Sequence, residues 1–397
     1  MIRPHHADNH ASPRAEAVAD LSQAVAVTGY SGSGKTWLIS RLAKLLSQQM
    51  SVGYLKNSTH RFSMDREGKD TDIAWSSGAA AVSIQDPAHT AWIARGAADP
   101  HLDRAYWLSC DCVLVEGAKS SSLAKLVVVD KIGEIVGEVE RGAISNVAAF
   151  VVRSTHKEAA RRVRSFVAAT RRTESTPPVF AADDVPEIAR FVQDILTARA
   201  ARTPLYGLVL SGGASSRMGQ DKGVLDFRGS PQVQNAFGLL GSVCDEVYVS
   251  VREQPAGDSP YAGLPLITDR FIGIGPAGGI LSAMHEFPGA AWLVLGCDMP
   301  FVTKELLFTL KREREALKLA TAFRSGTNGL PEPLCACYEP ASRYLFHSHL
   351  ATGKVSARRL LSRARVKLLD PPDQSLLENV NTPEEYRKAV ERMAGKV

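Results

Sequence analysis

One glycine-rich segment, 29–36, limits the folds open to this chain more than any other feature. It reads Gly29, Tyr30, Ser31, Gly32, Ser33, Gly34, Lys35 and Thr36, and it matches the eight-position phosphate-binding loop, or P-loop, at every fixed position. The motif needs a strand before it and a helix after it; residues 24–28 are apolar, and leucines recur at helical spacing over 36–50. The segment therefore predicts an α/β domain in which backbone N–H groups and a helix N-terminus bind the phosphates of a nucleoside triphosphate.

The P-loop also predicts where magnesium binds. We expect Lys35 to reach the β- and γ-phosphates and Thr36 to hold Mg²⁺. A carboxylate at the end of a neighbouring strand completes such a site, and the apolar run 112–115 is followed by Glu116. The Asn-Lys-x-Asp tetrad that reads guanine in ordinary G proteins is absent after the predicted strand 148–152, so this half does not reveal the base.

Short apolar runs alternate with helical patterns along the chain, which predicts βαβ units and mainly parallel sheets. At about 100–200 residues a domain, 397 residues suggest two or three domains. We expect a disordered tail over 1–21, a first α/β domain over 22–199 that ends in a helix over about 185–198, a joint over 200–204, and a second α/β domain over 205–397. The predicted strands are 24–28, 52–55, 80–84, 112–115, 126–129, 148–152, 205–210, 246–251, 292–295 and 334–338.

The second half opens with another kind of glycine-rich loop. It reads Leu210, Ser211, Gly212, Gly213, Ala214, Ser215, Ser216, Arg217, Met218, Gly219, Gln220, Asp221 and Lys222. Backbone N–H groups at 212–214 and the cations Arg217 and Lys222 can surround a triphosphate without P-loop geometry. Asp298 follows the predicted buried strand 292–295, a position from which a carboxylate can hold Mg²⁺. These features argue against a P-loop kinase or ATPase whose second half only binds a substrate.

Several segments of the first half, besides the P-loop, form a recognisable set: 56–60 (KNSTH), 68–72 (GKDTD), 78–79 (GA) and 114–119 (LVEGAK). Over about 22–199 the chain resembles the MobB-type adapter of molybdopterin guanine dinucleotide synthesis, a small GTP-binding P-loop protein. The resemblance implies that Lys56 and Asp70 lie near the nucleotide or its metal, and it is compatible with a homodimer formed through this domain. Members usually have His where this chain has Asn57.

Five further motifs follow in the second half: the loop 210–222, Asp269, the glycine-rich helix start 275–280, the segment 292–300 that contains Asp298, and Asn379-x-Asn381-Thr-Pro. Over about 204–397 they resemble MobA-type molybdenum cofactor guanylyltransferases, which implies a Rossmann-like (GT-A-like) nucleotidyltransferase fold. The resemblance assigns GTP binding to Leu210, Gly212, Gly213, Lys222, Asp269, Gly278 and Asp298. It makes Lys222, Arg217 and Asp298 catalytic and places Asn379 and Asn381 on the pterin side, although Asn381 could equally belong to the turn before a capping box at Thr382 and Glu385.

The resemblance implies that GMP passes from GTP to molybdopterin with release of pyrophosphate, with Mg²⁺ as cofactor. Apo-molybdoenzymes and the molybdenum-inserting protein are the implied protein partners. Two alternatives stay open. One is a cytidylyltransferase acting on the same cofactor, although such relatives usually carry Ala where this chain has Gly212; the other is a GTPase scaffold that delivers cofactor to apo-molybdoenzymes.

Composition excludes few function classes but favours a cytoplasmic protein. No apolar run approaches the ~20 residues of a membrane span, and the first twenty residues lack the apolar centre of a secretory signal. A net charge of +5 fits anionic small molecules at least as well as nucleic acid, so we expect neither nucleic-acid nor membrane partners. The pairs Cys110/Cys112 and Cys335/Cys337 are read as packed, reduced thiols, with zinc or a disulfide as the alternative.

Overall fold

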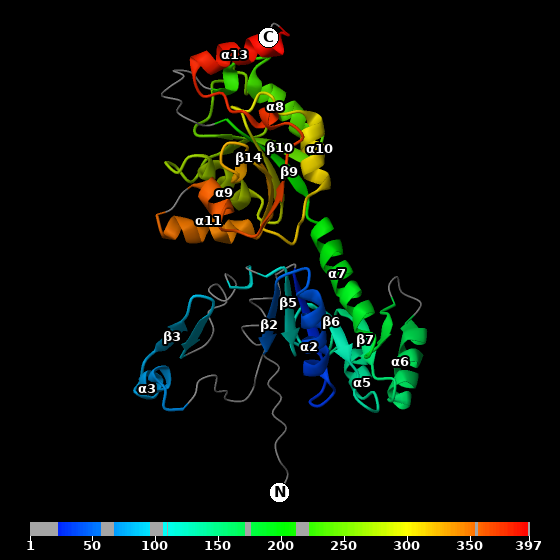
Figure 1. Cartoon of the computed structure of the whole chain (residues 1–397). Helices are drawn as coiled ribbons and strands as arrows, with labels where there is room; N and C mark the ends of the chain where they lie inside the picture. The colour runs from blue at the N-terminus through cyan, green and yellow to red at the C-terminus, as the bar shows by residue number, and fades with distance from the viewer. Residues whose placement is uncertain are drawn as a thin grey trace. The chain divides into compact units, whose positions relative to one another are not determined.

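The chain divides into two compact units, each with its own sheet (Figure 1). The computed structural model describes residues 23–56, 67–95, 106–108, 110–170, 176–211, 222–353 and 356–395. The units are 1–194 and 195–397. The expected tail over 1–21 lies outside the described residues.

The first unit is built on a parallel sheet with the strand order β2-β5-β1-β6-β7-β8. Its strands are β1 (Ala24–Thr28), β2 (Val52–Lys56), β5 (Cys112–Glu116), β6 (Ala124–Val128), β7 (Val147–Val152) and β8 (Val179–Ala181). Its longer helices are α2 (Lys35–Leu46), α6 (Lys157–Thr170) and α7 (Val185–Ala201), with the short α5 (Ile135–Glu140) between. Every residue of β1, β5 and β6 is buried, which fits the apolar runs predicted at 24–28, 112–115 and 126–129; β6 buries Lys125 as well.

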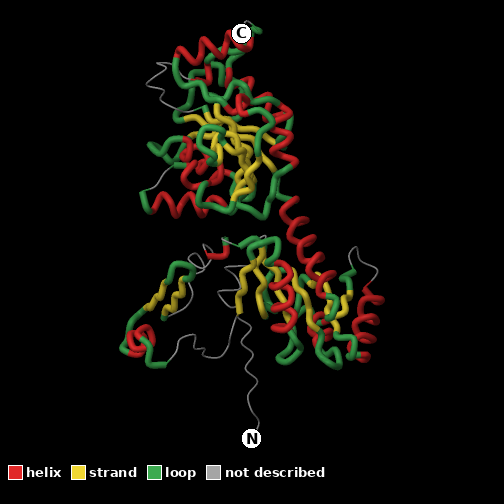
Figure 2. Tube along the Cα trace, viewed as in Figure 1, coloured by secondary structure: helices red, strands yellow, loops and turns green. Residues whose placement is uncertain are grey.

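The strand predicted over 80–84 exists, but its expected place among parallel strands is wrong. β3 (Ala81–Gln85) pairs antiparallel with β4 (Thr90–Ala94), which the sequence analysis did not foresee, and the two form a separate two-stranded sheet beside α3 (Asp70–Ser76) (Figure 2). The reason lies in the turn between the strands. The Asp86 carboxylate accepts hydrogen bonds from the backbone N–H groups of Ala88 and His89, and this local turn reverses the chain.

The second unit contains a seven-stranded mixed sheet with the order β11-β10-β9-β12-β14-β13-β15. Its strands are β9 (Leu205–Leu210), β10 (Glu246–Val251), β11 (Leu266–Thr268), β12 (Ala291–Gly296), β13 (Ala320–Arg324), β14 (Pro331–Tyr338) and β15 (Val366–Leu369). Only β14 runs antiparallel to its neighbours. Its helices are α8 (Gln232–Gly241), α9 (Pro276–Glu286), α10 (Lys304–Arg312), α11 (Ser342–Ala351), α12 (Ala357–Leu361) and α13 (Pro383–Met393). Residues of α8 and α10 share one core with the strands, and those of α9, α11 and α12 share another, so helices pack on the sheet from two sides, as the predicted Rossmann-like fold requires.

The joint predicted over 200–204 is shorter in the structure. Helix α7 continues to Ala201, and Ala200 is buried, because an alanine-rich segment prolongs a helix readily. Next to it, the Thr203 carbonyl accepts a hydrogen bond from Arg314 and the Pro204 carbonyl accepts one from the backbone N–H of Ala291. These two residues are therefore fixed to the second unit.

A buried ion pair in the second unit joins the segment after α10 to the residue that follows β14. Arg314 donates from Nε and Nη2 to the two carboxylate oxygens of Glu339, at 2.6 and 2.8 Å, and the two side chains are only 12% and 3% exposed. We expect Glu339→Ala to lower the free energy of unfolding by about 3–5 kcal/mol, because Arg314 would be left buried without its partner. Urea unfolding would measure the loss. Glu384→Ala, which breaks the exposed pair with Lys388, is the control and should change stability little; equal losses in both variants would contradict this account.

Candidate functional site

The P-loop of the first unit has the backbone shape that its glycines permit. Gly32 and Gly34 have φ values of 75° and 103°, which residues with a Cβ rarely adopt. Helix α2 begins directly afterwards, at Lys35. The Lys35 ammonium donates to the Tyr30 carbonyl at 2.7 Å, and burial lowers its pKa although Glu116 opposes that shift. The predicted order of strand, loop and helix is confirmed.

Glu116 is the centre of a polar cluster beside the P-loop. Its carboxylate is 3.2 and 3.3 Å from the Thr36 hydroxyl, and its Oε1 is 3.5 Å from the Lys56 ammonium. Tyr54 donates to its Oε2 at 2.7 Å, and burial and this carboxylate raise the pKa of Tyr54. The side chains of Thr36 and Glu116, predicted to bind magnesium, are thus brought together, and a hydroxyl and a carboxylate are hard oxygen ligands of the kind Mg²⁺ prefers.

Among the described residues, no hydrogen bond or ion pair joins Asp70 to this cluster. Asp70 is exposed at the first residue of α3, and Asn57 lies outside the described residues. Tyr54 was missed in the sequence, although its place two residues before Lys56 on one strand puts both side chains on the same face. That spacing was the signal that could have found it.

In the second unit, three side chains from distant segments meet at the ends of the strands. The Lys222 ammonium donates to the Asn381 amide oxygen at 2.6 Å and to Asp298 Oδ2 at 3.3 Å. Asp298 Oδ1 is buried and has no hydrogen-bond partner within the described parts of the chain. A buried carboxylate oxygen without a hydrogen-bond partner is a suitable ligand for a cation. Asp298 therefore fits a bound Mg²⁺, which prefers such oxygen ligands. The residues Gly212, Gly213, Ala214 and Arg217 lie outside the described residues.

The segment that carries Asn381 is held by its own helix cap. Thr382 accepts from the backbone N–H of Glu385, and the Glu385 carboxylate accepts from those of Thr382 and Asn381, so the predicted capping box is confirmed. The backbone N–H of Val380 also donates to the Asp298 carbonyl at 2.7 Å. The cap therefore positions Asn381. Its backbone belongs to the turn before α13 while its side chain contacts Lys222, so a structural role in the turn and a role in the site are compatible.

Three other predicted GTP-binding residues make contacts with neighbouring parts of the protein itself. Asp269 accepts from the Ser250 hydroxyl at 2.7 Å, and burial raises the pKa of its carboxyl. Gly278 is buried within α9, where a Cβ would stand 2.1 Å from the carbonyl oxygen of Phe271. Close packing on its own chain therefore already requires glycine there. Leu210 ends β9 and packs against the core.

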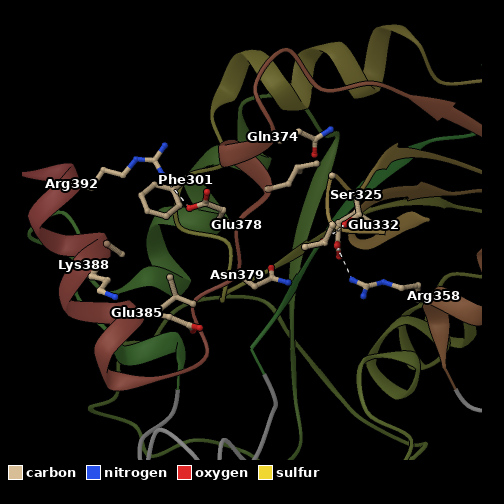
Figure 3. Close-up of a pocket in the computed structure, with 15 residues that line it drawn as sticks. Phe301, Ser325, Glu332, Arg358, Gln374, Glu378, Asn379, Glu385, Lys388 and Arg392 are labelled. Carbon is tan, nitrogen blue, oxygen red and sulfur yellow. Dashed lines mark hydrogen bonds and ion pairs between the residues drawn. The ribbon is translucent and has the colours of Figure 1, made fainter. Parts of the chain in front are cut away.

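A cavity of about 720 Å³ is lined by Asn379 and Val380, which directly precede Asn381 of the cluster with Lys222 and Asp298; Figure 3 shows the residues that line it. Asn379, Glu332 and Arg358 line part of it. Arg358 donates from Nη2 to Glu332 at 2.9 Å, whereas Arg358 Nε and Asn379 Oδ1 are buried and lack partners in the described ranges. Burial raises the pKa of Glu332, and the nearby Asp298 charge adds to that shift. Unpaired polar atoms around one cavity point to a polar ligand. The sequence analysis did not identify Arg358, which no motif marked.

The cysteines pack as expected. Cys335 and Cys337 lie together on β14 and are fully buried, as is Cys112 on β5, and burial raises the pKa of the Cys112 thiol to about 12. Among the described residues, none of the six cysteines forms a disulfide, and no group of three or more metal-binding side chains occurs. Within the same residues, no helix has the length and apolar content to cross a membrane.

Comparison with known proteins divides the chain as the structure does. Residues 24–152 match the family "Molybdopterin guanine dinucleotide synthesis protein B", and residues 207–368 match the "MobA-like NTP transferase domain". A molybdenum cofactor biosynthesis bifunctional protein of Synechocystis is 34% identical over 48% of this chain and 54% of its own length, so the matched part of the chain spans about half of that relative.

Single-function relatives and solved structures also match. A probable molybdenum cofactor guanylyltransferase of Methanothermobacter thermautotrophicus is 34% identical over 45% of this chain and 95% of its own length. The crystal structure of Bacillus subtilis MobB is similar at 27% identity over 44% of this chain and 97% of that one, with a TM-score of 0.33. Through its second half, the chain therefore belongs to the molybdenum cofactor guanylyltransferase family of nucleotidyltransferases, and residues 24–152 of its first half match the molybdopterin guanine dinucleotide synthesis protein B family.

Proposed function

We propose that the second unit transfers GMP from GTP to molybdopterin and so forms the dinucleotide cofactor. The observation that supports this most is the cluster of Lys222, Asp298 and Asn381, with its unpaired Asp298 oxygen, beside a cavity large enough for a second substrate. The identity of the transferred group is taken from relatives that are named probable molybdenum cofactor guanylyltransferases.

The reaction needs charge neutralisation more than a protein nucleophile. The phosphate monoester of the acceptor attacks the α-phosphate of GTP, the bond from that phosphorus to the bridging oxygen of the β-phosphate breaks, and pyrophosphate leaves. Bound Mg²⁺ would offset the charge repulsion between the phosphates. Asp298 would hold that ion and Lys222 would contact the triphosphate; Arg217 and the backbone at 212–214 are proposed to complete the phosphate site, with Leu210, Asp269 and Gly278 nearer the nucleoside.

The first unit is proposed to bind GTP through the P-loop, with Mg²⁺ held by Thr36 and Glu116. Lys56 contacts Glu116 and would lie near the metal; Asp70 is proposed to approach the nucleotide. A cytoplasmic location, a homodimer through this unit, and contacts with apo-molybdoenzymes and the molybdenum-inserting protein complete the proposal.

Pyrophosphate release tests the proposal against its alternatives. The full chain should release pyrophosphate from GTP only when purified molybdopterin is present, and a delivery scaffold without transferase activity would release none. Faster release from CTP than from GTP would instead establish a cytidylyltransferase.

Arg358 gives a prediction for the acceptor cavity. We expect Arg358→Lys to raise the KM for molybdopterin about tenfold, with the KM for GTP unchanged, because lysine lacks the planar Nε–H and paired donors of the guanidinium. Steady-state kinetics with each substrate varied in turn would measure both constants. Arg392→Lys is the matched control, since Arg392 lines the same cavity but is already engaged by Glu378 and Ser375. An equal effect of the two variants, or a rise confined to GTP, would contradict the assignment.

A further inference from the structure

We propose that Asp183 reads the base of the nucleotide bound to the P-loop and selects guanine, with Arg153 and Ser154 forming the rest of the base site. This inference rests on the proposed nucleotide binding by the first unit and adds what gives that site its specificity. The residues after 148–152 lack the Asn-Lys-x-Asp tetrad, so the sequence left the base open.

The sheet order sets the direction in which the base must leave the P-loop. β1, which precedes the loop, lies between β5 and β6, and β7 and β8 continue the sheet beyond β6. The metal side is the β5 and β2 side, where Glu116, Lys56 and Tyr54 gather. Magnesium bridges the β- and γ-phosphates. The α-phosphate and the nucleoside are at the other end of the triphosphate, so they point toward the ends of β6, β7 and β8.

The end of β7 touches the P-loop directly. A Cβ placed on Gly34 would stand 2.7 Å from Nη2 of Arg153, the residue that follows β7. The same guanidinium lies 6.0 Å from the ring centroid of Trp37, in the first turn of α2. A planar guanidinium stacks on aromatic faces, so Arg153 offers the purine a flat cationic surface immediately beside the phosphate loop.

The next strand supplies the carboxylate. β7 and β8 pair in parallel, with Val152 opposite Ala181, and this register brings Ser154 and Asp183 together; the Ser154 hydroxyl donates to Asp183 Oδ2 at 3.2 Å. Asp183 is exposed and can accept further hydrogen bonds. An ionised carboxylate only accepts. Guanine presents two donors on its edge, N1–H and the 2-amino group, whereas adenine presents an acceptor at N1, so this carboxylate favours guanine.

The test is a change of base preference in the full chain. Fluorescent GTP and XTP analogues are titrated into the wild type and into Asp183→Asn, and binding by the first unit is defined as the part lost in Lys35→Ala. Xanthine carries an oxygen where guanine has the 2-amino group, and an asparagine amide can donate to it. We expect Asp183→Asn to bind GTP about 10- to 100-fold more weakly and XTP more tightly, as for loss of a bidentate base contact. Asp184→Asn, the adjacent exposed carboxylate, is the matched control and should keep the wild-type preference.

The outcomes separate this inference from the function on which it rests. Unchanged P-loop-dependent binding of GTP by Asp183→Asn, or a switch to XTP in Asp184→Asn instead, would overturn the base site and leave the nucleotide site standing. Binding that Lys35→Ala does not reduce at all would overturn nucleotide binding by the first unit together with the base site. Pyrophosphate release in the presence of molybdopterin reports separately on the second unit.

Discussion

Asp298→Asn is expected to lower guanylyl transfer about 10³-fold while nucleotide binding by the P-loop unit stays at the wild-type level. The substitution keeps the shape of the side chain but removes the negative charge next to the unpaired, buried Oδ1. Loss of a direct metal ligand should cost more than the 10- to 100-fold typical of residues that only support ligands. Pyrophosphate release measures transfer, and fluorescent GTP binding measures the first unit.

Asn381→Asp provides the comparison for this variant. It places a second carboxylate beside Lys222, whose ammonium donates to the Asn381 amide oxygen at 2.6 Å in the wild type. The side chains of Thr382 and Glu385, which make the helix cap, stay in place. A loss of transfer in Asp298→Asn that rising Mg²⁺ concentration restores fully would indicate weakened metal binding, as proposed. Wild-type transfer rates in Asp298→Asn would remove this carboxylate from the site.

The converse result is expected for Lys35→Ala. Nucleotide binding by the first unit should fall about 100-fold, because an ammonium that forms charged hydrogen bonds to two phosphate groups is lost, while guanylyl transfer by the second unit persists. Lys44→Ala, at the other end of the same helix, is the control for general effects on α2. Loss of both activities in a folded Lys35→Ala protein would show that the two sites do not act independently.

Much of this architecture follows from local sequence. β1, β5 and β9 are largely buried in the sheets and therefore read as mainly apolar runs. Gly29 follows β1, Glu116 ends β5, and a glycine-rich loop begins just after β9. Together with the P-loop motif, this pattern at the strand ends predicted that Thr36 would lie near Glu116, 80 residues away; Lys222 and Asp298, 76 residues apart, were assigned to one site by the family resemblance. The pattern is informative because the ends of parallel strands share one edge.

Other features depend on pairings that no short pattern encodes. The short apolar run 80–84 predicts a strand but not its partner, so the separate hairpin with β4 was missed. The pair of Glu332 and Arg358 joins a strand to a five-residue helix, and Ser154 meets Asp183 only through the register of β7 on β8. The packing role of Gly278 was not visible in the sequence either, because the Phe271 carbonyl that leaves no room for a Cβ lies outside α9.

The continuity of α7 determines how the two halves can be separated experimentally. The division between the units falls between Asp194 and Ile195, inside a helix that runs to Ala201 and whose residues Leu196 and Ala200 are buried. A cut or a flexible insertion at 194 would interrupt helical hydrogen bonds on both sides of that position. The buried apolar side chains of α7 would then no longer be held by one continuous helix. A cut after Ala201 keeps the whole helix on one fragment. A split protein, a protease site or a spacer therefore belongs there, although the division between the two compact units lies seven residues earlier.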